Sequence, residues 1–196
     1  TTYTVHGDAT VDVGYSFTKT DMRLEEIPRI GMQMQMPEQY TDLSWYGRGP
    51  HENYADRKSS AFVGLYESTV ADQYVPYVRP QENGYKTDTR WMTITDSKGF
   101  GLRFEGRPLF SFAAMNYLHD DFESPGRLSA YRPDAILVNT HIDDVRPRDL
   151  VRINIDYGQM GVGGDDSWGA RTHDRYCLRD KKYDYSFRIV PLTGTD

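Results

Sequence analysis

The sequence is poor in cysteine, in long apolar runs and in clustered positive charge. Its one cysteine, Cys177, excludes an internal disulfide framework and a cysteine-rich zinc module. No apolar stretch approaches the ~20 residues that a membrane-spanning helix needs. The net charge is −6, from 23 Lys and Arg against 29 Asp and Glu, and no basic run occurs. This balance argues against nucleic acid or an anionic membrane as the partner.

What the sequence does have is aromatic rings. Hydrophobic residues make up only 38%, yet aromatic residues reach 13%, with 15 Tyr, 8 Phe and 3 Trp. Disordered chains are poor in aromatic residues, so a folded domain is expected. The length suits one domain, and no linker or internal repeat divides it, so residues 1–196 are predicted to form a single β-sandwich domain. The chain starts inside a strand-like pattern without a methionine, which suggests a fragment of a longer polypeptide.

Apolar and polar residues alternate with a period of two along several segments. Such alternation predicts strands with one apolar face and one face toward water. Parallel sheets would give continuous apolar runs instead, so the fold class is predicted to be all-β and antiparallel. Residues 96–99, Asp-Ser-Lys-Gly, predict a hairpin, and residues 59–72 fit either a short helix or a strand. The alternating segments are Val11–Phe17, Ile30–Met36, Val151–Tyr157 and Tyr183–Ile189.

Three segments are rich in glycine, proline and polar residues and read as loops, where binding residues tend to lie. They are residues 44–57, SWYGRGPHENYADR, residues 75–84, VPYVRPQENG, and residues 160–169, MGVGGDDSWG. In the third, Trp168 offers a flat apolar face and Asp165 and Asp166 offer hydrogen-bond acceptors, a combination that suits a sugar ring. The alternative is that Trp168 fills the sandwich and the two aspartates bind turn amides.

No catalytic residue is predicted within the chain. A retaining glycosidase needs two carboxyl groups ~5 Å apart, whereas Asp165 and Asp166 are sequence neighbours whose side chains point apart in an extended chain. Glu52 and Glu82 could pair only through the fold. The five histidines show no H-x-x-x-H spacing, so no metal site is predicted either.

Taken in order, the loop motifs resemble those of a known family. Three motifs match, in the same order along the chain. They are residues 43–54, LSWYGRGPHENY, with Asp56-Arg57, then residues 76–84, then residues 160–168, and Pro28-Arg29-Ile30-Gly31 also fits. These motifs are similar to the C-terminal domain of glycoside hydrolase family two β-galactosidases, also called the β-galactosidase small chain. The resemblance covers roughly residues 10 to 192.

The resemblance implies a large antiparallel supersandwich, similar to that of galactose mutarotases, as the last domain of a longer multidomain chain. It implies a retaining β-galactosidase as the parent, which hydrolyses terminal non-reducing β-D-galactose residues. The catalytic glutamates and the Mg and Na sites of that parent would lie on a separate barrel domain. This chain is therefore expected to hold no cofactor and to be inactive alone.

The resemblance also suggests which residues bind carbohydrate. The tryptophan of the third motif, here Trp168, would stack on the aglycone sugar, with Asp166 and Ser167 beside it. Glu82 and Asn83 resemble a mobile segment at the active-site edge. Residues 169–173 depart from the expected Ser-Pro continuation, which leaves the aglycone open and admits a β-galactoside other than lactose.

Two other readings remain at this point. A stand-alone carbohydrate-binding or aldose-mutarotase-like protein would need an acid/base pair, and the adjacent His51 and Glu52 are not expected to converge on one sugar. A structural interaction domain would bury Trp168 with no groove beside it. The expected partners are a β-galactoside or its aglycone sugar, preceding domains of the same polypeptide and further copies in a homo-oligomer. Cytoplasm and periplasm both stay open.

Overall fold

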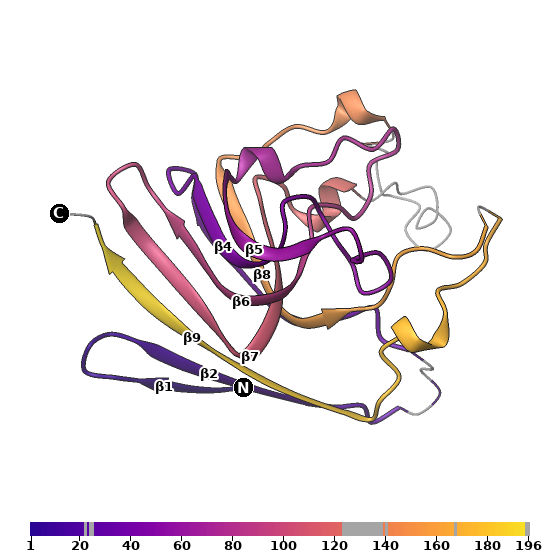
Figure 1. The fold of residues 1–196 in the computed structure, drawn as a ribbon, viewed down its shortest axis with the longest axis horizontal. Coiled ribbons are helices and arrows are strands. Elements are labelled where there is room, and N and C mark those ends of the chain that lie inside the picture. Colours follow the sequence, from indigo (N-terminus) through magenta and orange to yellow (C-terminus); the bar gives the residue numbers. More distant parts are fainter. Residues whose placement is uncertain (22, 24–25, 123–138, 140, 167, 195–196) are drawn as a thin grey trace, which may run out of the picture.

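The computed structural model describes residues 1–21, 23, 26–122, 139, 141–166 and 168–194 (Figure 1). Nine strands, all paired antiparallel, dominate this part of the chain. The helical elements among the described residues are short 3-10 turns at Ala71–Gln73, His119–Phe122, Ile142–Asp144 and Asp174–Tyr176. None of them has the length or apolar character of a membrane-spanning helix. The strands are β1 Thr2–Val5, β2 Val11–Thr18, β3 Arg29–Pro37, β4 Asp42–Gly49, β5 Phe62–Thr69, β6 Lys86–Thr95, β7 Phe100–Met115, β8 Leu150–Gln159 and β9 Lys182–Thr193.

The long strand β7 joins the two halves of the fold. Its first part, Phe100–Arg107, pairs with β9, and its second part, Ser111–Met115, pairs with β8. The strand order is β1-β2-β9-β7-β6-β4-β5, while β8 branches from β7 and carries β3 on its other side. The β6–β7 register shifts twice, between Lys86 and Thr89 and between Thr89 and Trp91. The predicted all-β antiparallel fold is confirmed, as are the four alternating strands and the hairpin at residues 96–99.

The main core lies where side chains from both branches of β7 meet. Phe104 and Phe187 come from the β7–β9 branch, and Phe112 and Ile153 come from the β7–β8 branch. Trp45 of β4 packs in the same core, with its ring centroid 6.0 Å from that of Phe112. Aromatic rings thus fill much of the interior. The ambiguous segment 59–72 is resolved as strand β5 followed by a single 3-10 turn.

One expectation about the strands is wrong. The polar side of β8, formed by Arg152, Asn154 and Asp156, was expected to face water, but these residues are only 1%, 4% and 0% exposed. Loop residues cover this side, because Tyr85 packs there with Tyr54 and Ala113, and the Tyr85 hydroxyl donates a hydrogen bond to Asp156. The outer face of β8 is therefore a buried polar layer beneath the loops.

Candidate functional site

The three motif segments come together at one end of the fold. The prediction that residues 44–57 form a loop is wrong for residues 44–49, which belong to strand β4 and pair with β5, and only the later part of this motif is a loop. A carboxylate oxygen of Glu52, Oε2, accepts a hydrogen bond from the Gly84 amide at 2.7 Å, which joins the first loop to the second. Asp56 Oδ2 accepts a hydrogen bond from the Gly163 amide at 2.7 Å, which joins the first loop to the third. Asp56 and Gly163 are 107 residues apart in the chain, so distant segments form one surface here.

A cleft of about 470 Å³ lies between these loops. A smaller hollow of about 290 Å³ adjoins it and shares Arg57 and Gly163 in its lining. The larger cleft is lined by Pro28, Arg57, Tyr77, Gln81, Glu82, Gln159 and residues 160–163.

One wall of the cleft is an Arg57, Glu52 and Tyr77 cluster. Arg57 donates to Glu52 Oε1 at 2.7 Å and to the Tyr77 hydroxyl at 3.1 Å, and the Tyr77 hydroxyl also donates to Glu52 Oε1. Burial, followed by the bond to Glu52, raises the pKa of the Tyr77 phenol. The phenol therefore keeps its proton at neutral pH, and this wall presents a fixed cation and a neutral aromatic ring.

Trp168 has 94% of its surface exposed, and Gly164 and Asp165 of its loop line the smaller hollow. Its segment extends outward from the sheets (Figure 1). Asp166 Oδ1 accepts hydrogen bonds from the amides of Trp168 at 2.8 Å and Ala170 at 3.2 Å. The prediction that Trp168 fills the sandwich is wrong, and so is the structural-domain reading that buries it. The expectation that an aspartate binds turn amides holds for Asp166.

The base of the Trp168 loop is fastened by contacts of its own. Thr172 Oγ1 lies 2.8 Å from the Gly161 carbonyl oxygen and 3.1 Å from that of Gly163. His173 Nε2 lies 2.8 Å from a carboxylate oxygen of Asp165, which ties the two ends of the loop together. The exposed ring is therefore carried by a braced loop.

The other predicted site residues are placed as follows. Glu82 lines the cleft. Asn83 is buried, and its side chain makes hydrogen bonds within its own loop. Its Oδ1 accepts from the Val75 amide at 3.0 Å, and its Nδ2 donates to the Gln81 carbonyl oxygen at 2.9 Å. Ser167 lies outside the described residues. Sugar binding by Trp168, Asp166, Ser167, Glu82 and Asn83 stays a prediction.

His51 and Glu52 diverge, as expected. The exposed His51 ring lies 3.1 Å from the Ser60 hydroxyl, whereas Glu52 turns inward to Arg57 and Gly84. The two side chains do not form an acid/base pair around one sugar. Among the described residues, no three His, Cys, Asp or Glu side chains gather as metal ligands.

Sequence reasoning missed the residue behind the cleft, Arg29. Its guanidinium reaches Glu82 Oε1 at 2.9 Å, Asp156 Oδ2 at 3.2 Å, His119 Nε2 at 2.8 Å and Gln159 Oε1 at 3.1 Å. Burial, then the positive charges of Arg152 and Arg29, lowers the pKa of His119 to about 3. The imidazole is therefore neutral and accepts the hydrogen bond from Arg29. The Pro-Arg-Ile-Gly match was the only sequence signal for this position.

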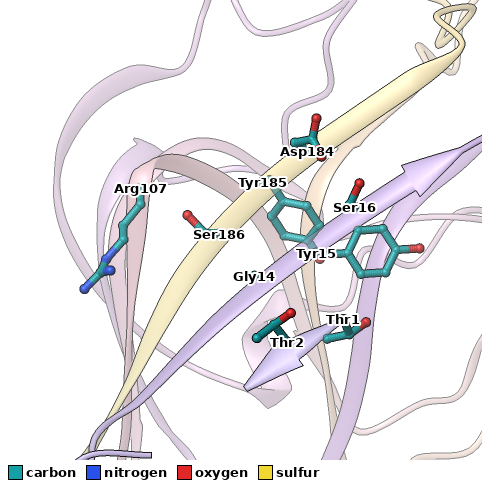
Figure 2. A pocket seen from close by; sticks show the side chains of 9 residues that line it. All are labelled: Thr1, Thr2, Gly14, Tyr15, Ser16, Arg107, Asp184, Tyr185 and Ser186. Atoms are coloured by element: carbon teal, nitrogen blue, oxygen red, sulfur yellow. The ribbon is translucent and has the colours of Figure 1, made fainter. Parts of the chain in front are cut away.

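Another pocket, of about 420 Å³, is formed by strands rather than by the motif loops. Figure 2 shows its side chains arranged along β1, β2 and β9, among them Thr2, Ser16 and Tyr185, with Arg107 of β7 at one end. No motif residue lines it, so the cleft between the loops is the candidate site.

The structure is an all-β, antiparallel fold in which three motif segments gather around a cleft. The family can be named from comparisons with known proteins. The chain belongs to the β-galactosidase small chain family, whose model matches residues 1–189. The resemblance inferred from the motifs is thereby confirmed.

Three relatives illustrate the match, all named β-galactosidase. The protein of Priestia megaterium is 41% identical over 97% of this chain, that of Vibrio cholerae 34% over 95%, and that of Pseudoalteromonas haloplanktis 33% over 98%. The chain spans only 16–17% of the length of these relatives, about a sixth.

Proposed function

We propose that this chain acts as the sugar-binding rim of a longer β-galactosidase, which hydrolyses terminal non-reducing β-D-galactose residues. In this proposal the chain binds the aglycone sugar, and the catalytic carboxylates come from another domain of the same polypeptide. The observation that supports it most directly is Trp168, a ring left 94% exposed on a loop that is braced at its base. The braced loop presents the indole's flat apolar face and its N–H donor to solvent, where the C–H face of a sugar ring could stack on it.

The residues of the chain suit binding better than bond cleavage. Asp166 is engaged with turn amides and Asp165 with His173. Glu52 is held by Arg57, Tyr77 and the Gly84 amide. Double displacement would need two carboxyl groups ~5 Å apart on either side of the scissile bond, whereas these carboxylates are engaged in holding the loops. The chain's contribution is to hold the leaving or accepting sugar in position, which lowers the entropic cost of the reaction. Any Mg or Na would act through the other domain.

Binding can be tested by titrating the chain with D-glucose and D-galactose and following backbone and indole NMR signals. We expect Trp168→Ala to weaken sugar binding about threefold to tenfold, the range of one aromatic contact. The matched control is Phe62→Ala, which removes another exposed ring on the edge strand β5. Equal weakening in both variants would contradict a stacking role for Trp168.

Catalysis can be tested separately with a chromogenic β-galactoside. The purified chain is expected to show no turnover above the buffer rate. Turnover that survives further purification would place the catalytic carboxylates in this chain and contradict the proposed division of labour. Assembly into a homo-oligomer stays a prediction.

A further inference from the structure

Arg29 lies directly behind the cleft and holds two of its polar wall residues with one guanidinium. Its NH2 atom donates both to Glu82 Oε1, at 2.9 Å, and to Gln159 Oε1. Glu82 comes from the second motif loop and Gln159 from the end of β8. Because the two acceptors share one donor atom, their side chains are held next to each other in the wall that both line.

The guanidinium settles which way the Gln159 amide points. Arginine has donors and no acceptor. The two donors of Arg29, Nε and NH2, therefore require the carbonyl oxygen of Gln159 on their side. The amide nitrogen Nε2, with its two N–H donors, is the group left for the cleft.

Glu82 supplies the complementary group. Its Oε1 is engaged by Arg29, whereas its Oε2 lies 3.8 Å from His119 Nδ1, beyond hydrogen-bond distance. Arg29 is itself held by two further contacts. Its Nε pairs with Asp156 of β8, and its guanidinium carbon lies 5.3 Å from the centroid of the Tyr85 ring. The cleft wall thus offers one donor, Gln159 Nε2, beside one acceptor, Glu82 Oε2.

We propose that Arg29 is a positioning residue that holds Gln159 and Glu82 as a donor–acceptor pair for two neighbouring hydroxyls of the bound sugar. One hydroxyl would accept from the Gln159 amide, and its neighbour would donate to the Glu82 carboxylate. Each sugar hydroxyl can play either role, so a fixed pair selects adjacent hydroxyls rather than a single one. The proposal rests on the proposed function, because it assigns recognition within the same cleft.

The test compares D-glucose with 2-deoxyglucose and 3-deoxyglucose, each of which lacks one hydroxyl, by NMR titration of the 196-residue chain. Glucose should bind about threefold to tenfold more tightly than at least one deoxy sugar, the range expected for one hydrogen bond. Arg29→Lys replaces the planar guanidinium, with its several fixed donors, by a single ammonium group. The ratio of glucose affinity to deoxy-sugar affinity should then fall to about one. The matched control is Arg103→Lys, at an arginine that pairs with Glu105 outside the cleft.

Gln159→Glu provides an independent variant. It keeps an acceptor for Arg29 but removes the amide donor, so the ratio should again collapse, whereas Gln39→Glu in the exposed turn after β3 should leave it unchanged. This variant decides the question if Arg29→Lys does not fold. Melting temperatures of all variants are recorded alongside.

The outcomes separate the two proposals. A merely structural Arg29 would weaken all three sugars equally and keep the ratio, which would overturn the positioning role. Sugar binding without any discrimination in the parent chain would overturn this inference and leave the proposed function standing. The absence of sugar binding would overturn both.

Discussion

The two faces of strand β8 are both buried, yet they are built in opposite ways. Val151, Ile153 and Ile155 face the main aromatic core, where close packing removes apolar surface from water. Arg152, Asn154 and Asp156 face the loops, where burial depends on specific polar partners. The apolar face holds the sandwich together, while the polar face supports the loops that form the candidate site.

The polar face also carries polar atoms without a partner. Among the described residues, the side-chain atoms Asp156 Oδ1, Asn154 Oδ1 and two nitrogens of Arg152 have no hydrogen-bond partner. Unpaired buried polar groups cost free energy. The same strand therefore gains stability on one side and gives some of it up on the side nearest the cleft, a pattern common at functional sites.

The largest effect is expected on the apolar face. Ile153→Ala should destabilise the chain by about 2–5 kcal/mol, because it leaves a cavity in a fully packed core. Leu65→Ala, at a 72% exposed position of β5, serves as control and should change the free energy of unfolding by less than about 0.5 kcal/mol. Urea denaturation followed by circular dichroism measures both. Similar small losses at both positions would show that β8 is not part of the core.

A smaller loss is expected on the polar face. Asp156→Ala removes an acceptor of Arg29 and of the Tyr85 hydroxyl, whereas Arg29 keeps Glu82 as a partner. The expected cost is about 1–3 kcal/mol, the penalty for leaving buried donors unsatisfied. Asp184→Ala, at an exposed ion pair with Lys182, controls for loss of a carboxylate. A loss as large as that of Ile153→Ala would mean that the two faces contribute equally to stability.

The sequence predicted the strands well because alternation is a local signal. Val11–Phe17 and Ile30–Met36 appear as β2 and β3 to within one residue at each end, and Tyr183–Ile189 appears in β9, which extends four residues further to Thr193. The same signal misjudged β8, since a polar residue on a strand says nothing about what covers it. Burial of Asp156 depends on Tyr85, 71 residues away in the chain, and no local pattern encodes that contact.

The site was predicted in part. The motifs drew attention to three segments that the structure brings together through Glu52 and Asp56, which the sequence did not single out for that task. The exposure of Trp168 could not be predicted from the motif, because a tryptophan among glycines is compatible both with a buried core ring and with an exposed ring that stacks on a ligand. Arg29 was missed because its partners are scattered along the chain, from Glu82 to Gln159.

The subtlest difference between the faces lies in their response to pH, since only the polar face contains titrating groups. Burial raises the pKa of Asp156 from its ordinary value of 3.8 to about 7, although Arg29 favours the charged form. The folded chain then keeps this proton at pH values where the unfolded chain has lost it. The stabilisation is present in full below pH 3.8 and is lost as the pH rises toward 7.

His119 opposes this trend. Its pKa is lowered from 6.5 to about 3, so its contribution to stability is present above pH 6.5 and is lost as the pH falls toward 3.

The two contributions partly cancel in the parent chain, and Asp156→Asn separates them. The variant's free energy of unfolding, measured relative to the parent, should rise by about 1–2 kcal/mol between pH 6 and pH 7.5, within the limit of ~1.4 kcal/mol per pH unit for one proton. Asp42→Asn at the exposed start of β4 should show no such change, and a flat difference for Asp156→Asn would mean that Asp156 is ionised throughout and that its face of β8 is wetter than its burial implies.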